Sequence, residues 1–194
     1  MRMGVFRLLV VLVPLAGAGC APAHADADRE AARREAAQYE AYRAPAKVVA
    51  GLALAPGMRV ADVGAGRGFL TTRIAAAVGA GGHVVATDID AQALSAIARS
   101  PAIETRVVRA DDPGLEAGAY DRILVAEVDQ YLADRAAYLG RLARALKPGG
   151  FIAVSNRMPY RAPLLAAATQ AGLRATEVPL ALPAHFFVKL EPAR

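Results

Sequence analysis

A turn with three closely spaced glycines restricts the fold of this chain more than any other segment. Residues 60–70 read VADVGAGRGFL, in which an apolar stretch passes through Gly64, Gly66 and Gly68 into a segment with helical periodicity. Glycine allows a tight turn after a strand and a close approach of a ligand to the backbone, and the next helix begins with unpaired N–H groups. The pattern predicts a ligand site at a strand-to-helix turn, with a turn that binds nothing as the alternative.

The glycine spacing argues against two common nucleotide-binding loops. The dinucleotide fingerprint G-x-G-x-x-G needs a glycine where the chain has Phe69, so a nicotinamide-dependent enzyme is disfavoured. A P-loop needs Gly-Lys followed by Ser or Thr, and no such segment follows the turn. We therefore expect no pyrophosphate cradle.

Short apolar runs alternate with helical segments after residue 58, which is the pattern of an α/β fold with a parallel sheet. Strands are predicted at 59–63, 83–87, 105–110, 121–126, 151–155, 173–178 and 185–190. Helices are predicted at 46–54, 69–78, 91–99, 134–146 and 163–171, the fourth of them closed by Pro148-Gly149-Gly150. The last two strands are close enough in sequence to form an antiparallel hairpin.

Acidic residues end the second and third predicted strands. Asp88 lies 24 residues after Gly64, where a carboxylate can accept both ribose hydroxyls of a nucleoside. Asp111 and Asp112 follow the third strand, where an acceptor can meet an adenine amino group. For Asp112, a turn before Pro113-Gly114 is the alternative.

Five segments of the chain, taken in sequence order, resemble the motifs of class I S-adenosylmethionine-dependent methyltransferases, and the resemblance covers about residues 38–194. The matching segments are VADVGAGRG (60–68), VVATDID (84–90), RADDP (109–113), DRILVAEV (121–128) and LKPGGFIAVS (146–155). The family implies a doubly wound, mostly parallel seven-stranded sheet of the Rossmann-like kind, ending in a C-terminal antiparallel hairpin. Residues 41–75 are similar in particular to a bacterial subgroup that often carries secretion leaders.

The resemblance implies S-adenosylmethionine as the cofactor and assigns residues to its parts. The implied cofactor-binding residues are Asp62, Gly64, Ala65, Gly66, Gly68, Asp88, Ile89, Asp111, Asp112 and Glu127. The glycine loop would approach the methionine part, Asp62 would hold the loop and the amino group, and Asp88 would bind the ribose. Ile89 would pack on the adenine, one of the two later aspartates would read it, and Glu127 would lie near the methyl donor. For Asp62 and Glu127, the alternative is that each satisfies local backbone N–H groups.

The loop after the fourth strand differs from that subgroup, which tends to carry Tyr-His-His where this chain has Asp129-Gln130-Tyr131. Histidine can act as a general base near neutral pH, whereas Asp129 would need a raised pKa to do so. Asp129 and Tyr131 are the predicted catalytic residues. Methyl transfer itself can proceed by positioning and desolvation, because the cofactor is already activated.

Two groups of residues, one before the first predicted strand and one in the last, could either contact a ligand or pack against the domain. Tyr39, Tyr42 and Arg43 are candidates for a lid over the cofactor, or for a helix that packs its aromatic rings on the domain. His185 and the Phe186-Phe187 pair are expected to pack in the sheet rather than to contact a ligand.

Composition and charge argue against other classes of protein. The chain has one cysteine and three well-separated histidines, so neither an intramolecular disulfide nor a zinc site built from these residues is expected. The net charge is +5, and the 23 basic residues are scattered among acidic ones without forming a basic run. No nucleic-acid partner is therefore expected. A small-molecule acceptor is the expected partner.

The first twenty residues have the layout of a signal peptide, with Arg2 and Arg7, an apolar stretch and small residues before Cys20. The division predicted is a signal at 1–20, a tether and helix at 21–45 and a methyltransferase domain at 46–194. Cleavage before Cys20 would allow a lipid tether to the membrane, cleavage after Ala25 would release a periplasmic protein, and a cytoplasmic protein with a misassigned start is the alternative. Since S-adenosylmethionine is made in the cytosol, an exported nucleoside-binding module without catalysis is the alternative to a methyltransferase acting on a small-molecule or lipid-like acceptor.

Overall fold

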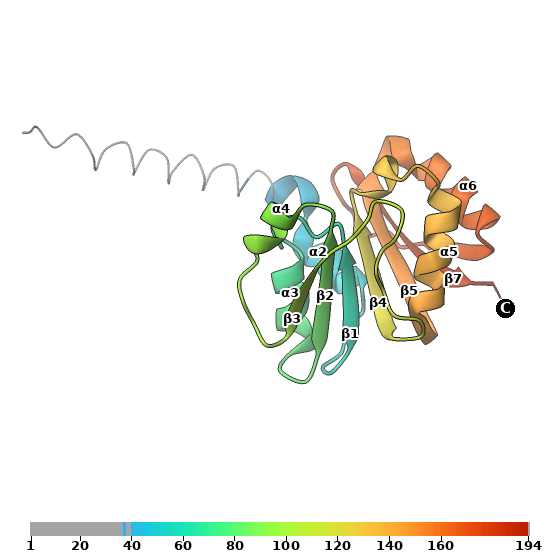
Figure 1. The fold of residues 1–194 in the computed structure, drawn as a ribbon. Helices are drawn as coiled ribbons and strands as arrows, with labels where there is room; N and C mark the ends of the chain where they lie inside the picture. The colour runs from blue at the N-terminus through green and yellow to red at the C-terminus, as the bar shows by residue number, and fades with distance from the viewer. Residues whose placement is uncertain (1–36, 38–39, 194) are drawn as a thin grey trace, which may run out of the picture. The chain divides into compact units, whose positions relative to one another are not determined.

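A seven-stranded sheet between helices forms the described part of the chain (Figure 1). The computed structural model describes residue 37 and residues 40–193, so the predicted leader and Tyr39 lie outside the described residues. The strands are β1 Arg59–Val63, β2 His83–Asp88, β3 Ile103–Val107, β4 Tyr120–Ala126, β5 Leu146–Arg157, β6 Leu173–Glu177 and β7 His185–Pro192. The helices are α2 Pro45–Gly51, α3 Thr71–Val78, α4 Ala91–Ser95, α5 Arg135–Ala145 and α6 Arg161–Gln170, with 3-10 turns η1 Asp129–Tyr131 and η2 Met158–Tyr160.

The strand order is β3-β2-β1-β4-β5-β7-β6. The first five strands in this order pair in parallel, and β7 runs antiparallel to both β5 and β6. The predicted α/β fold with a mostly parallel sheet and a C-terminal antiparallel hairpin is confirmed. Because β7 runs against its neighbours, its first residue, His185, pairs with Arg157 at the carboxyl end of β5.

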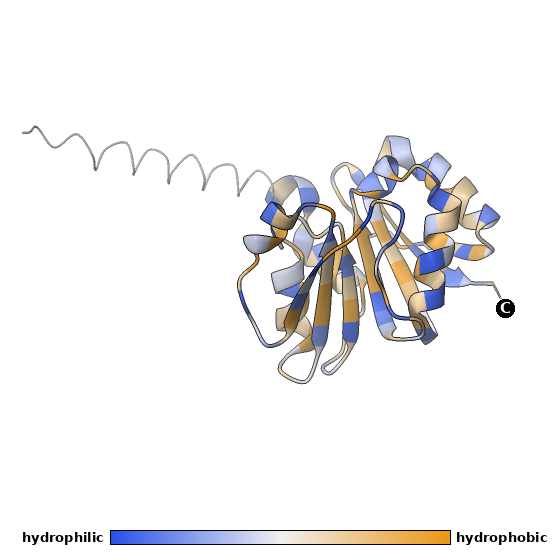
Figure 2. Cartoon of the chain, viewed as in Figure 1, coloured by the Kyte–Doolittle hydropathy of each residue, from blue (hydrophilic) through white to orange (hydrophobic). Residues whose placement is uncertain are grey.

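Helices cover both faces of the sheet, so the sheet is doubly wound. Val60 and Leu124 belong to the core under α2 and α3, while the neighbouring residues Ala61 and Ile123 belong to the core under α5 and α6. This alternation follows from the two-residue period of a strand. Figure 2 shows the central strands coloured largely as hydrophobic, as expected where both faces are buried. Within the described residues, none of the helices combines the length and apolar composition of a membrane span.

Three elements differ in extent from their predictions. Strand β3 ends at Val107, which frees residues 108–110 from the sheet. Helix α4 ends at Ser95 instead of continuing to residue 99. The predicted stop at Pro148-Gly149-Gly150 lies within β5, because Leu146 already pairs with Tyr120.

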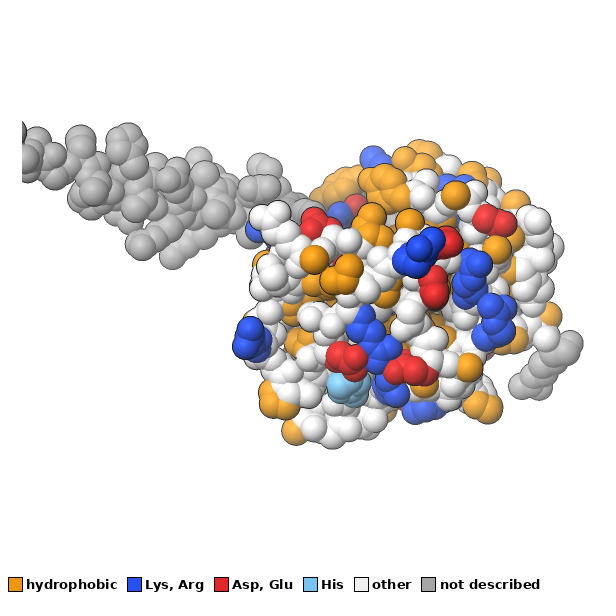
Figure 3. All heavy atoms as spheres, viewed as in Figure 1, with side chains coloured by type: hydrophobic (Ala, Val, Ile, Leu, Met, Phe, Trp, Pro, Cys, Tyr) orange, Lys and Arg blue, Asp and Glu red, His pale blue; other side chains and the backbone are white. Residues whose placement is uncertain are grey.

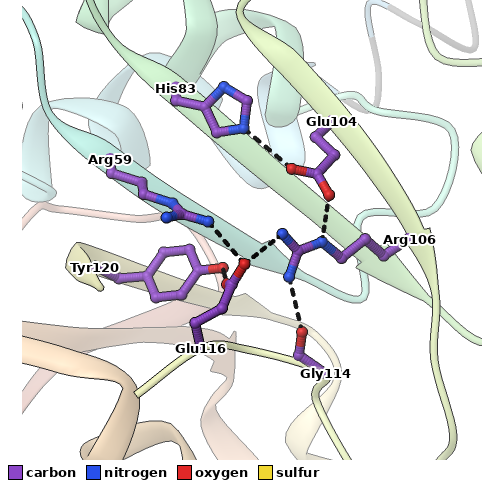
Figure 4. A network of polar contacts seen from close by, with 7 residues as sticks. All are labelled: Arg59, His83, Glu104, Arg106, Gly114, Glu116 and Tyr120. Carbon is purple, nitrogen blue, oxygen red and sulfur yellow. Dashed lines mark hydrogen bonds and ion pairs between the residues drawn. The ribbon is translucent and has the colours of Figure 1, made fainter. Parts of the chain in front are cut away.

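A polar network ties the segment between β3 and β4 to the sheet (Figure 4). Glu116 accepts hydrogen bonds from Arg59 at 3.0 Å, from Arg106 at 2.7 Å and from Tyr120, and the bond from Arg106 holds the pKa of Glu116 well below its usual range. Arg106 also bonds the Gly114 carbonyl at 3.0 Å. Figure 3 shows acidic and basic side chains adjoining one another around a histidine on this face. The network anchors the segment whose first residues reach the cavity described next.

Candidate functional site

The order of the strands reverses between β1 and β4, and ligands of open α/β sheets bind outside the carboxyl ends of the strands at such a point. A cavity of about 610 Å³ lies there. Residues at or just after the carboxyl ends of four strands line it, at 62–67, 69–70, 87–89, 108–110 and 126–128, together with Arg43, Tyr131, Leu132 and Tyr138. Its volume lies in the range of small-molecule sites.

The three glycines of the turn have different surroundings. All have positive φ, of +72° at Gly64, +54° at Gly66 and +81° at Gly68. A Cβ at Gly64 would lie 2.2 Å from Cγ2 of Val128, and one at Gly68 would lie 2.8 Å from Ile97, whereas one at Gly66 would meet nothing within 4 Å. Gly68 does not line the cavity, so its predicted place in the ligand site becomes a packing role against Ile97. Gly66 is the position where the backbone lies open to a ligand.

Asp88 joins this turn to the end of β2. Its Oδ2 accepts a hydrogen bond from the Gly66 N–H at 2.8 Å, and its Oδ1 accepts one from the Asp90 N–H at 3.0 Å. A carboxylate has about four acceptor positions, so each oxygen can accept one further donor. The adjacent Ile89 is 63% exposed and lines the same cavity. Asp88 and Ile89 thus place a paired acceptor beside an apolar surface.

Asp62 is buried at the end of β1 and lines the cavity. Burial raises its pKa to about 6; the hydrogen bond from the Thr71 hydroxyl lowers it, and the charge of Asp88 raises it. The Thr71 Oγ1 donates to Asp62 Oδ2 at 2.6 Å. A positively charged group in the cavity would therefore favour the ionised form of this carboxyl.

Glu127 brings together three segments that are distant in sequence. One carboxylate oxygen receives a hydrogen bond and ion pair from Arg43, and the other lies 2.7 Å from Nε2 of His185. The Tyr42 ring packs edge-on against the imidazole, with ring centroids 4.9 Å apart. His185 therefore does more than pack in the sheet. The antiparallel hairpin was the signal for it, since a reversed last strand begins at the carboxyl edge of its parallel neighbours.

Asp129 and Tyr131 have opposite environments. Asp129 is 1% exposed and does not line the cavity; it accepts a hydrogen bond from Asn156 and lies 3.4 Å from Nε of Arg135. Burial raises its pKa, but the side chain connects η1 to β5, which corrects the expectation that it faces an acceptor. Tyr131 lines the cavity and is 79% exposed.

Asp111 and Asp112 also lie outside the cavity lining. Arg109 donates to Asp111 at 3.1 Å, and Asp112 accepts from the Gly114 N–H at 2.9 Å, as a turn residue does. The earlier end of β3 explains the difference, because Val108, Arg109 and Ala110 occupy the positions expected of the aspartates. Among the described residues, no cluster of His, Cys, Asp and Glu could hold a metal ion.

A scan against family models matches residues 61–152 to the methyltransferase domain. The fold is similar to the crystal structure of an S-adenosylmethionine-dependent methyltransferase from Aquifex aeolicus, with a TM-score of 0.70 and 22% identity over 78% of this chain and 90% of that one. Residues 61–152 are thus similar to a methyltransferase domain. At this identity the structural similarity shows the fold alone.

Two curated relatives are also similar to part of this chain. Nocamycin O-methyltransferase of Saccharothrix syringae is 33% identical over 110 residues, covering 54% of this chain and 39% of that protein. A ubiquinone biosynthesis O-methyltransferase of Chelativorans sp. (strain BNC1) is 34% identical over 106 residues, covering 52% and 42%. The chain therefore spans about two fifths of the length of these relatives. Together the matches support S-adenosylmethionine as the cofactor.

The residues of the cavity fit this cofactor. A Cβ at Gly66 would enter open space beside the cavity, so the glycine leaves room for a ligand against the backbone. Asp62, Asp88 and Glu127 present three carboxyl groups to a ligand that carries an amino group, a sulfonium and two ribose hydroxyls. Asp88 would hold the ribose, and Asp62 the amino group.

The raised pKa of Asp62 predicts a pH-dependent affinity for S-adenosylmethionine. The cationic ligand favours the ionised form of Asp62, whose pKa without ligand is about 6. The affinity should therefore rise as the pH increases from 5 to 7 and this carboxyl loses its proton. Isothermal titration calorimetry across this range tests it, with Asp62→Asn as the variant that should lose the dependence. The same slope in Asp62→Asn would assign the titration to another group.

Proposed function

We propose that this chain is an S-adenosylmethionine-dependent methyltransferase that acts on the hydroxyl group of a small-molecule or lipid-like acceptor. The observation that carries the proposal is the bond between the Gly66 N–H and Asp88, which sets an open backbone turn beside a carboxylate with remaining acceptor positions. The hydroxyl group is inferred from the two relatives, both of which are named as O-methyltransferases.

The protein would contribute mainly positioning and exclusion of water. The bound cofactor supplies a methyl group on a positively charged sulfur. Phe69, Leu70 and Leu132 line the cavity with apolar surface that excludes water from this centre. Glu127 and Tyr131 are the first two ionisable lining residues after β4, so they are the groups placed nearest to that strand that could accept a proton from an acceptor hydroxyl. Methyl transfer to an already ionised acceptor needs only alignment.

Thermal unfolding of the full chain with S-adenosylmethionine, and with its demethylated product, tests the cofactor site. A ligand at 100 times its dissociation constant should add about 2.7 kcal/mol to the free energy of unfolding. Transfer of a radiolabelled methyl group to a panel of phenols, catechols and hydroxylated lipids then tests the activity. If neither compound stabilises the chain, the proposal is wrong.

A binding module without catalysis is the second candidate. One observation favours it: Asp129, the predicted base, bonds Asn156 and does not line the cavity. The matches to methyltransferases favour the enzyme. Stabilisation by both compounds, with no transfer to any member of a broad acceptor panel, would instead favour the binding module.

A further inference from the structure

The backbone around Glu127 is held in an unusual conformation. Glu127 has a φ of +55°, which lies in the left-handed region that residues other than glycine seldom adopt. Its N–H donates to the Ser155 carbonyl at 2.8 Å, and its carbonyl accepts from the Gln130 side chain at 2.8 Å. Such conformations persist where the surroundings fix them, and they concentrate at functional sites. The backbone therefore fixes the direction in which the Glu127 side chain leaves β4.

The imidazole of His185 is placed to donate to Glu127. Its side chain is 2% exposed, and Nε2 lies 2.7 Å from a Glu127 oxygen. An ionised carboxylate only accepts hydrogen bonds, so the proton of this contact belongs to Nε2. Within the described part of the chain, the buried Nδ1 has no hydrogen-bond partner, so the Glu127 contact is the hydrogen bond that orients the ring. We therefore expect Nε2 to be the donor of this contact.

Arg43 and His185 act on the same carboxylate in different ways. Arg43 brings a permanent positive charge to one oxygen, whereas the His185 ring fixes the other oxygen by a hydrogen bond from Nε2. Glu127 lines the cavity, where its negative charge attracts a cationic ligand more strongly than it would in water. Without His185, Arg43 would be the remaining side-chain partner of Glu127 among the contacts described, and the carboxylate would be free to turn toward it.

We propose that His185 is a positioning residue, which holds the Glu127 carboxylate against the cavity so that the site favours S-adenosylmethionine over its demethylated product. The inference rests on the proposed function. S-adenosylmethionine carries a positive charge on sulfur, and the product does not, so a fixed carboxylate separates the two by charge. This preference would promote exchange of spent product for fresh cofactor.

Two substitutions at His185 in the full chain separate its hydrogen bond from its ring. His185→Phe keeps a ring against Tyr42 but has no donor, and His185→Gln keeps a donor but has no ring. Calorimetric titration should show that His185→Phe weakens S-adenosylmethionine binding about tenfold. Binding of the product should change by less than about threefold, and His185→Gln should retain most of the preference of the natural chain.

The outcomes distinguish this inference from the proposed function. An equal loss of affinity for both compounds in His185→Phe, or a His185→Gln variant no better than it, would overturn the positioning role. A natural chain that binds neither compound would instead contradict the proposed function.

A measurement on the natural chain covers the case in which His185→Phe does not fold. Nitrogen-15 NMR of the imidazoles reports which ring nitrogen carries the proton, and the half-exposed His83 provides an internal comparison. The proton of His185 should be on Nε2, and its signals should shift when S-adenosylmethionine binds. A proton on Nδ1 alone, or signals unchanged at saturation, would overturn the proposal.

Discussion

Asp88→Ala is expected to lower the affinity for S-adenosylmethionine about 100-fold. The substitution removes the acceptor for two ribose hydroxyls, and a hydrogen bond to a charged group contributes about 1.5–3 kcal/mol. It also removes the bond at 2.8 Å that holds the Gly66 N–H, so the turn loses its link to β2. Calorimetric titration at fixed ionic strength measures the loss, and the demethylated product should lose affinity by a similar factor because it has the same ribose.

Asp90→Ala is the matched control for Asp88→Ala. Asp90 lies two residues away and does not line the cavity; its side chain caps α4 by accepting from the N–H groups of Gln92 and Ala93. Its loss should cost about 1 kcal/mol of stability and leave the affinity for the cofactor unchanged. If Asp88→Ala retained full affinity, the ribose assignment would be wrong.

Gly64→Ala is expected to lower the free energy of unfolding by about 3 kcal/mol. A side chain at its φ of +72° is strained by about 1–2 kcal/mol. The new Cβ would lie 2.2 Å from Cγ2 of Val128, and overpacking of this kind costs about 1–3 kcal/mol more. Denaturant unfolding measures the effect as a lower midpoint with an unchanged slope.

Two other glycines separate strain from contact. Gly172 has a φ of +70°, no atom within 4 Å of an added Cβ and no place in the cavity lining, so Gly172→Ala should show the strain alone. Gly66→Ala, with open space beside a cavity position, should cost about as much stability as Gly172→Ala but also weaken cofactor binding. A Gly64→Ala variant as stable as Gly172→Ala would show that Val128 moves aside freely.

Burial explains which strands could be predicted from the sequence. Strands β1 and β4 lie in the middle of the sheet, and their helix-covered faces require apolar runs that are visible in the sequence. Strand β3 is at an edge and only partly buried, so its apolar pattern did not mark its end. The prediction placed the end of β3 three residues too late. Asp111 and Asp112 were therefore expected at the cavity, where residues 108–110 lie instead.

The candidate site divides in the same way between local and distant features. Gly66 and Asp88 follow strand ends, so their nearness could be predicted from local patterns and the parallel order of β1 and β2. The contact between Glu127 and His185 spans 58 residues and depends on the reversal of β7. The burial of Asp129 depends on how η1 turns its side chain toward Asn156, which no spacing in the sequence indicates.

The position of β7 between β5 and β6 also sets when the contact to Glu127 can form during synthesis. A nascent chain that has emerged only as far as β6 already contains the glycine turn, Asp88 and Glu127, yet one edge of β5 and the imidazole partner of Glu127 are still missing. Strand β7 must leave the ribosome before it can insert beside β5. A translation product that stops short of residue 185 would therefore contain every residue that lines the cavity and still lack the imidazole partner of Glu127.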